Sequence, residues 1–390
     1  MRASLAFVPV VVLGVVFAAC GGDDEESSTS TEQDAGVDVE AGQDVATDVR
    51  EEASIDAPVE AAEDAPTDAP NDVFDAGPPP EPTPADIQFQ AINPIPSGEL
   101  LLFNDWNASP NTVSSVTLDG QTTTEIFRAY RVWSMGVSRG NDRIAFACGD
   151  PDQAANYGVN MSDAIQHTWI YDVAAQSAEV VAYGNINDEC HTFGPGDERL
   201  YVCRRYDFND APEYKGWRLG VIDLDTHDFE FLTPEQPMVF TLHPQPTPDE
   251  SEMYFTQIDI PASPPSGVRS IRKQSLPSGT DEAVRAEADS PMLSPDGTSY
   301  LFRNYFDEGT LWSSSLDGQT TVQVVASRVT EPVWSPDGTR VAYLLRDDAN
   351  NCDHIYVAAA DGSQADNPVQ VRDCATTGEF ITELDWIVTP

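Results

Sequence analysis

The chain has 390 residues, of which 66 are acidic and 20 are basic, so its formal net charge at pH 7 is −46. This acid excess argues against nucleic acids and anionic lipid surfaces as partners, because the chain would repel their phosphate groups, and it chiefly favours solubility. The acidic residues are concentrated near the N-terminus, where residues 21–86 contain 21 of them and one basic residue, Arg50.

Residues 1–19 are predicted to be a signal peptide. Arg2 precedes an apolar run from Leu5 to Ala19 that is too short for a membrane span. The run ends in small residues directly before Cys20, which resembles the lipobox of bacterial lipoproteins, with Phe17 where that family usually has leucine. The resemblance implies a lipidated Cys20 at the mature N-terminus. An ordinary secretory signal with an incidental cysteine is the alternative.

Residues 20–86 are predicted to be this lipidated cysteine followed by a disordered tether. The segment contains one aromatic residue, Phe74, and ends in a proline-rich stretch at residues 78–84. It cannot bury enough apolar surface to offset its conformational entropy, and its like charges and prolines extend it. We expect a stalk that contacts the membrane through the lipid anchor only.

Residues 87–390 are predicted to be all-β, because short β-rich runs recur between Gly, Pro, Asp and Asn residues. The phrase Ser-Pro-Asp-Gly occurs at residues 294–297 and 335–338, and Leu-Asp-Gly-Gln-Thr-Thr occurs at residues 118–123 and 316–321. Aligning the chain on these turns gives six copies of a repeat. The strands after the six first turns are predicted at residues 100–103, 143–147, 199–202, 252–255, 299–302 and 340–345.

A period of roughly 41–56 residues with four strands per copy is typical of a β-propeller blade. Residues 292–297 and 333–338 resemble the WD-like repeats of the TolB-type propeller. The resemblance implies six four-stranded blades around a central channel, and it implies no activity. A seven-bladed ring is the alternative count.

The C-terminal segment is predicted to close the ring. Residues 381–386 align with residues 329–334, the first strand of the last blade, yet no blade follows them. The first blade lacks a good first strand, because two prolines interrupt residues 93–96 and proline is excluded from central strands. We therefore expect residues 380–388 to supply that strand and remove the open edges.

Five cysteines follow Cys20, and export permits disulfides. Cys190 and Cys203 are equidistant from a predicted turn, and so are Cys352 and Cys374, which would place each pair directly opposite in a hairpin. Two hairpin disulfides with a free Cys148 are the preferred pairing. Cys148 could instead compete for Cys190 or Cys203.

No catalytic or metal site is predicted. Ser138 lies in a G-x-S-x-G pattern, but a strand rather than a helix follows it, so the repeat turn explains it better. Oligogalacturonate lyases of a related propeller type bind a metal in the channel through histidines. Only His191 and His243 fall on predicted channel-lining strands here, and that clustered pattern is missing.

The long loops between second and third strands are predicted to emerge on one face and to form a binding face. They are rich in Asp and Asn, although turns favour these residues whether or not they bind a ligand. Calcium or another divalent metal is an alternative ligand, but no loop matches the EF-hand pattern. Exposed aromatic residues there would suit a protein or glycan partner. The candidate binding residues are Asp105, Trp106, Asp150, Asp152, Asp207, Asp210, Tyr305, Asp307, Asp347 and Asp348.

These features together predict a monomeric, non-enzymatic binding or scaffold lipoprotein of the bacterial cell envelope, periplasmic or cell-surface, that recognises an envelope protein or glycan. No cofactor is expected. A metal-dependent enzyme acting in the channel, a lyase or lactonase-like hydrolase, is the alternative, and a structural surface protein is a third possibility. The inference from fold to function is an analogy.

Overall fold

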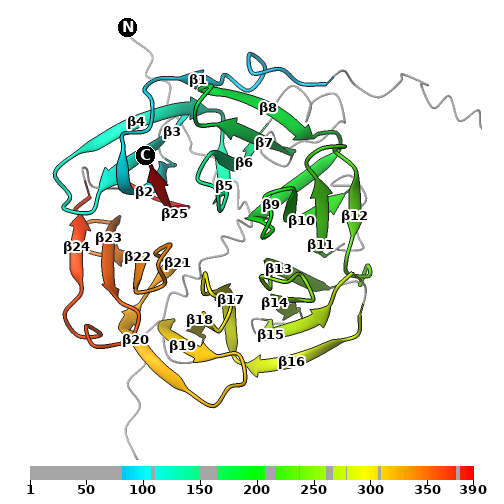
Figure 1. Ribbon diagram of the computed structural model, residues 1–390, viewed down its shortest axis with the longest axis vertical. Helices are drawn as coiled ribbons and strands as arrows, with labels where there is room; N and C mark the ends of the chain where they lie inside the picture. Colours follow the sequence, from blue (N-terminus) through cyan, green and yellow to red (C-terminus); the bar gives the residue numbers. More distant parts are fainter. Residues whose placement is uncertain are drawn as a thin grey trace, which may run out of the picture. The chain divides into compact units, whose positions relative to one another are not determined.

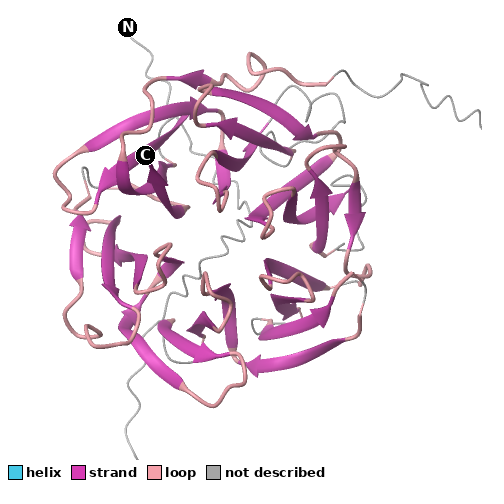
Figure 2. Cartoon of the chain, viewed as in Figure 1, coloured by secondary structure: helices cyan, strands magenta, loops and turns pink. Residues whose placement is uncertain are grey.

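The structure of the chain, a computed structural model, describes residues 81–106, 110–149, 165–206, 216–236, 238–260, 267–277, 279–305, 309–374 and 378–390. All regular secondary structure in these ranges is β-strand (Figure 2). They contain no helix long and apolar enough to cross a membrane. The predicted signal peptide, Cys20 and most of the predicted tether lie outside the described residues.

The strands form antiparallel sheets that follow one another around a common centre (Figure 1). Three sheets have four strands each, in sequence order. They comprise β13 (Val239–Pro246), β14 (Glu252–Asp259), β15 (Val268–Ser275) and β16 (Asp281–Ala286); β17 (Ala288–Leu293), β18 (Ser299–Asn304), β19 (Thr310–Ser315) and β20 (Thr321–Arg328); and β21 (Thr330–Trp334), β22 (Arg340–Asp347), β23 (Cys352–Ala359) and β24 (Val369–Arg372).

A larger sheet of eight strands contains two such four-stranded units. A single parallel bridge, between Gln166 and Asn187, joins the two units through β7 and β9. The units comprise β5 (Val132–Val137), β6 (Arg143–Gly149), β7 (Gln166–Asp172) and β8 (Ser177–Ala182), followed by β9 (Ile186–Phe193), β10 (Arg199–Tyr206), β11 (Arg218–Asp223) and β12 (Phe229–Phe231).

The remaining sheet combines both ends of the described chain in the order β1-β4-β3-β2-β25. β25 pairs with β2 over six residues, from Gly98 opposite Thr389 to Phe103 opposite Leu384. In Figure 1, β25, β5, β9, β13, β17 and β21 lie innermost. The strands of this sheet are β1 (Gln90–Ala91), β2 (Gly98–Asp105), β3 (Asn111–Thr117), β4 (Thr123–Ala129) and β25 (Leu384–Thr389).

Neighbouring sheets pack through aromatic side chains. Phe127 of β4 lies 5.1 Å from Phe146 and 4.9 Å from Tyr171, measured between ring centroids, and all three are fully buried. Tyr254 of β14 meets Tyr300 of β18 in the same way, at 5.8 Å. Burying one such side chain contributes about 1.5–3 kcal/mol, so these contacts hold successive sheets together.

Five of the innermost strands have a β-bulge at the same place. In each, two residues oppose one residue of the next strand, and the second of the two is proline in three strands. A bulge redirects the side chains at that point. Here each of these five bulges lies on an innermost strand. The bulged pairs are Trp133 and Ser134, Cys190 and His191, His243 and Pro244, Ser290 and Pro291, and Glu331 and Pro332.

The repeated turns also contact one another. Asp197, in the turn after β9, accepts the backbone N–H groups of Arg139 and Gly140 in the turn after β5, at 2.8 and 2.7 Å. Pro248 similarly packs against Gly297, where a Cβ atom would lie 2.4 Å from the proline Cγ. The Ser-Pro-Asp-Gly phrase therefore serves both to reverse the chain and to join neighbouring sheets.

Candidate functional site

The candidate site lies on the face where second strands end and where third and first strands begin, here called the loop face. Trp106 follows β2 and Tyr305 follows β18, so both lie on it. Arg131 directly precedes β5 and Phe380 precedes β25, which places them on the same face. The predicted residues Asp105, Trp106, Tyr305, Asp347 and Asp348 lie at the ends of second strands or directly after them, and so on this face. Their role in binding stays a prediction.

Trp106 is held rigidly at the end of β2. Its backbone N–H donates to Phe380 O at 2.9 Å, and the Asn111 side chain donates to the carbonyl oxygens of Asp105 and Trp106 at 3.1 and 2.8 Å. The guanidinium of Arg131 lies over its ring at 5.2 Å, and Trp133 meets it edge-on at 4.6 Å. All three side chains are half-buried.

Further arginines on the loop face also stack on aromatic rings, and all of these residues are half-buried. Stacking on an aromatic face attracts a cation and aligns the planar guanidinium while leaving its N–H donors available. Measured from Cζ to the ring centroid, the pairs are Arg205 with Trp217 at 5.4 Å, Arg269 with Tyr305 at 4.5 Å and Arg346 with Phe380 at 5.2 Å.

Asp347 and Asp348 differ in what their carboxylates do. Asp347 accepts the backbone N–H groups of Ala349 and Asn350 and the side-chain amide of Asn350. These bonds hold the pKa of Asp347 below its ordinary value. Asp347 therefore orders its own loop, whereas Asp348 is exposed.

Five predicted binding residues belong to loops that the structure does not describe, so their predictions are untested. They are Asp150, Asp152, Asp207, Asp210 and Asp307.

Three half-buried carboxylates lie near the centre of the sheet arrangement. Burial raises the pKa of Glu189, on β9, and of Asp385, on β25, to about 7 each. It raises the pKa of Glu383 well above its ordinary value, and the nearby charges of Glu331 and Glu189 raise it further. Glu189 also accepts a hydrogen bond from Trp133 and is attracted by Arg205, so it connects the centre with the loop face.

A buried polar network includes a close serine–histidine pair. Ser134 Oγ lies 3.0 Å from His191 Nδ1, and Thr168 Oγ1 lies 3.1 Å from His191 Nε2 while donating to Asp188. Asp188 also accepts two hydrogen bonds from Arg204. Ser134 and His191 are only 3% and 4% exposed. Because Ser134 is on β5, Thr168 on β7, His191 and Asp188 on β9 and Arg204 on β10, the network joins these four strands.

His191 and His243 lie on β9 and β13, as predicted. Burial lowers the pKa of each to about 4, so both rings are neutral at pH 7. Their ring nitrogens have protein partners, because His243 Nδ1 lies 3.2 Å from Thr256 Oγ1 and His191 contacts Ser134 and Thr168.

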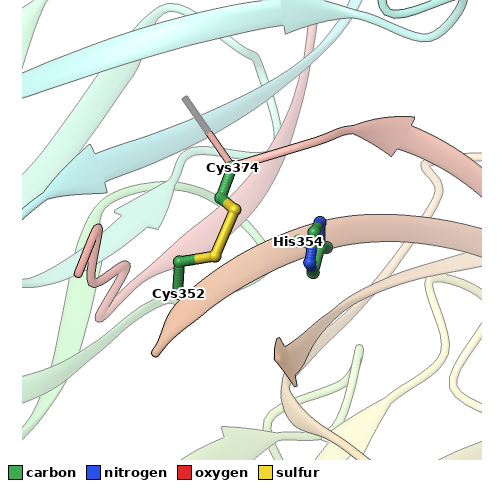
Figure 3. Close-up of side chains that lie close together, drawn as sticks. All are labelled: Cys352, His354 and Cys374. Carbon is green, nitrogen blue, oxygen red and sulfur yellow. A yellow bond between two sulfur atoms is a disulfide. The ribbon is translucent and has the colours of Figure 1, made fainter. Parts of the chain in front are cut away.

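Within the described ranges, one group of residues brings three potential metal-ligand atoms within 4.8 Å of one another, namely Cys352, His354 and Cys374. Figure 3 shows that the two sulfur atoms are bonded to each other, with His354 beside them. Disulfide sulfurs are not thiolates, and it is the thiolate that binds a metal. His354 instead pairs with Asp373 at 2.9 Å.

Both predicted disulfides are present, and Cys148 is free and buried. One detail of the prediction was wrong: Cys190 and Cys203 are not directly opposite. Cys203 pairs in register with Glu189, because Cys190 lies in the bulge of β9. Ser138 lies in the turn before β6, where its Oγ donates to Asp142 and accepts the N–H of Arg143.

Sequence reasoning missed Arg131, Trp133, Glu189 and Glu383. The same alignment that predicted the C-terminal strand pairs Glu383 with Glu331, so it could have indicated the acidic centre. No motif identifies Arg131, because its role depends on Trp106 from another sheet.

No family model and no curated protein matches the chain. Solved structures do match, and they include TolB-like β-propellers, so the described part of the chain has a TolB-like β-propeller fold. TolB from Acinetobacter baumannii is 14% identical, with a TM-score of 0.53 over 76% of this chain and 68% of that one. The putative TolB from Agrobacterium tumefaciens is 14% identical, with a TM-score of 0.50 over 76% of this chain and 100% of that one.

A third solved structure that matches has a different name. Hydrazine synthase from Kuenenia stuttgartiensis is 9% identical, with a TM-score of 0.55 over 76% of this chain and 47% of that one. Identities this low define the fold alone, since one fold hosts many functions.

Proposed function

We propose that the chain is a binding module of the bacterial cell envelope whose loop face recognises an envelope protein or glycan. Its scaffold is a six-bladed propeller, with β25 supplying the first strand of the first blade. The pairing of β25 with β2 supports this count, and so does the position of Glu383, which aligns with the bulge residue Glu331.

The observation that supports binding best is the set of four arginine–aromatic pairs on one face. Trp, Tyr and Arg are the residues that most often dominate the binding energy of protein interfaces. On the loop face they are half-buried, so each has a packed side that fixes it and an open side for a partner. The likeness to TolB structures agrees with this proposal at the level of fold.

Affinity capture from envelope extracts tests the proposal. The immobilised full chain should retain a partner that a Trp106→Ala, Tyr305→Ala double variant loses. An Arg139→Ala variant, altered on the opposite face, should retain it, and the three proteins should melt at similar temperatures. Equal capture by both variants would contradict the loop face, and a stoichiometric metal in the purified chain would favour the channel-centred enzyme.

Lipid anchoring at Cys20 is the second part of the proposal. It rests on the small residues before Cys20 and on the acidic segment after it. Metabolic labelling with a palmitate analogue should mark the chain in bacteria. A Cys20→Ser variant should lose the label and a Cys148→Ser variant should keep it.

A further inference from the structure

Arg131 differs from two other arginines of the loop face that stack on aromatic rings. Arg269 pairs with Asp289, and Arg346 donates to Asp353 at 3.0 Å. Arg131 stacks on Trp106, but no oxygen atom of the described residues accepts a hydrogen bond from its guanidinium.

The backbone holds Arg131 in this position. Its φ is +53°, a left-handed conformation that costs free energy in a residue other than glycine. Gly149 makes room for it, because a Cβ atom at Gly149 would lie 2.9 Å from Arg131 Cβ. The Gly149 N–H donates to Tyr130 O at 3.1 Å, and the Asn104 side chain donates to Val132 O at 3.0 Å. The guanidinium is therefore preorganised, which reduces the entropy lost on binding.

One indole ring stacks on the guanidinium and a second indole contacts the first. Arg131 lies over the ring of Trp106, and Trp133 meets Trp106 edge-on with 76° between the ring planes. Trp133 and Arg205 both lower the pKa of Glu189, against the larger effect of burial.

We infer that Trp106, Arg131 and Trp133 bind an acidic sugar of a glycan, with the sugar carboxylate on the guanidinium and the ring against the indoles. Guanidinium and carboxylate form paired, charge-assisted hydrogen bonds. A glycan fits better than an extended peptide, because the backbone groups that a peptide would need are already used. Trp106 N–H donates to Phe380 O, and the carbonyl groups of Asp105 and Trp106 accept from Asn111. The inference rests on the proposed binding function of the loop face.

The test measures binding of the full chain to oligosaccharides of galacturonic, glucuronic, mannuronic and sialic acids. Each is paired with its carboxyl-reduced, neutral form. At least one acidic oligosaccharide should bind about 10-fold to 100-fold more tightly than its reduced form, the range expected for hydrogen bonds to a charged group. An Arg131→Gln variant should lose this preference, and an Arg139→Gln variant, altered at an exposed arginine of the opposite face, should keep it.

Three outcomes would overturn the inference. They are equal binding of acidic and reduced forms, an unchanged preference in Arg131→Gln, and tighter binding of an acidic peptide than of every acidic oligosaccharide. If these occur while the loop face still captures a partner from envelope extracts, the proposed function survives and only the sugar site fails. If capture from envelope extracts fails as well, both the proposed function and the sugar site are refuted.

Discussion

The carboxylate of Asp385, on β25, accepts the backbone N–H of Val137, on β5, at 2.6 Å. Glu383 makes a similar contact, more weakly, with the N–H of Met135 at 3.4 Å. Side chains next to the C-terminus thus bind the backbone of an early strand, more than 240 residues away in sequence. These contacts join the sheet that contains β1 and β25, the first and last described strands, to the sheet that follows it.

Replacing Asp385 should destabilise the fold. Asp385→Ala leaves the Val137 N–H without its acceptor and removes the bond to Trp386 N–H. The bond to the Val137 N–H is partly buried. A buried donor left unsatisfied costs about 1–3 kcal/mol, so the free energy of unfolding in urea should fall by about 1 kcal/mol. Asp225→Ala, at an exposed turn, should change it by less than about 0.5 kcal/mol. Equal values for the two variants would refute a role of this contact in stability.

Stability should depend on pH through Glu383. Its pKa is raised in the folded chain, whereas an unfolded Glu has a pKa of about 4.3. A carboxyl group of this kind stabilises the fold fully below its unfolded pKa, and the contribution is lost as pH rises through the folded value. Glutamine does not titrate, so the melting temperature of Glu383→Gln should rise relative to that of the unmodified chain between about pH 5 and about pH 8.

Asp249 provides the matched control for this titration. Hydrogen bonds from Thr247 and Ser251 lower its pKa to about 2, so it is already ionised throughout that pH range. The melting temperature of Asp249→Asn relative to the unmodified chain should therefore stay constant from about pH 5 to about pH 8. A Glu383→Gln difference that is equally flat would mean that Glu383 is ionised in the folded chain without penalty.

Turn glycines should differ according to what lies beside them. Gly297 and Gly318 have similar φ values, +67° and +70°, so alanine costs each about 1–2 kcal/mol of backbone strain. Nothing lies within 4 Å of a Cβ atom at Gly318, whereas at Gly297 the Cγ of Pro248 lies at 2.4 Å. Overpacking should therefore make Gly297→Ala the more destabilising by at least about 1 kcal/mol in urea unfolding. Equal costs would show that the close approach of Pro248 to Gly297 does not constrain that turn.

Much of the fold could be predicted because its signals are local. The repeated turn motifs and the alternating apolar residues after them predicted all six second strands. The equal spacing of cysteines from a turn predicted both disulfides. The bulges were missed, since they depend on contacts between sheets, and this is why Cys190 was expected directly opposite Cys203. Arg131 was missed for the same reason, because its stacking partner is Trp106 of another sheet.

The central claim is that the loop face meets the partner, and site-specific photo-cross-linking in envelope preparations tests it most directly. A photoreactive phenylalanine replaces either Asp348, exposed in the loop after β22, or Asp225, exposed in a turn of the opposite face. A discrete cross-linked product should form from position 348 and not from position 225. A product from position 225 alone would contradict the account.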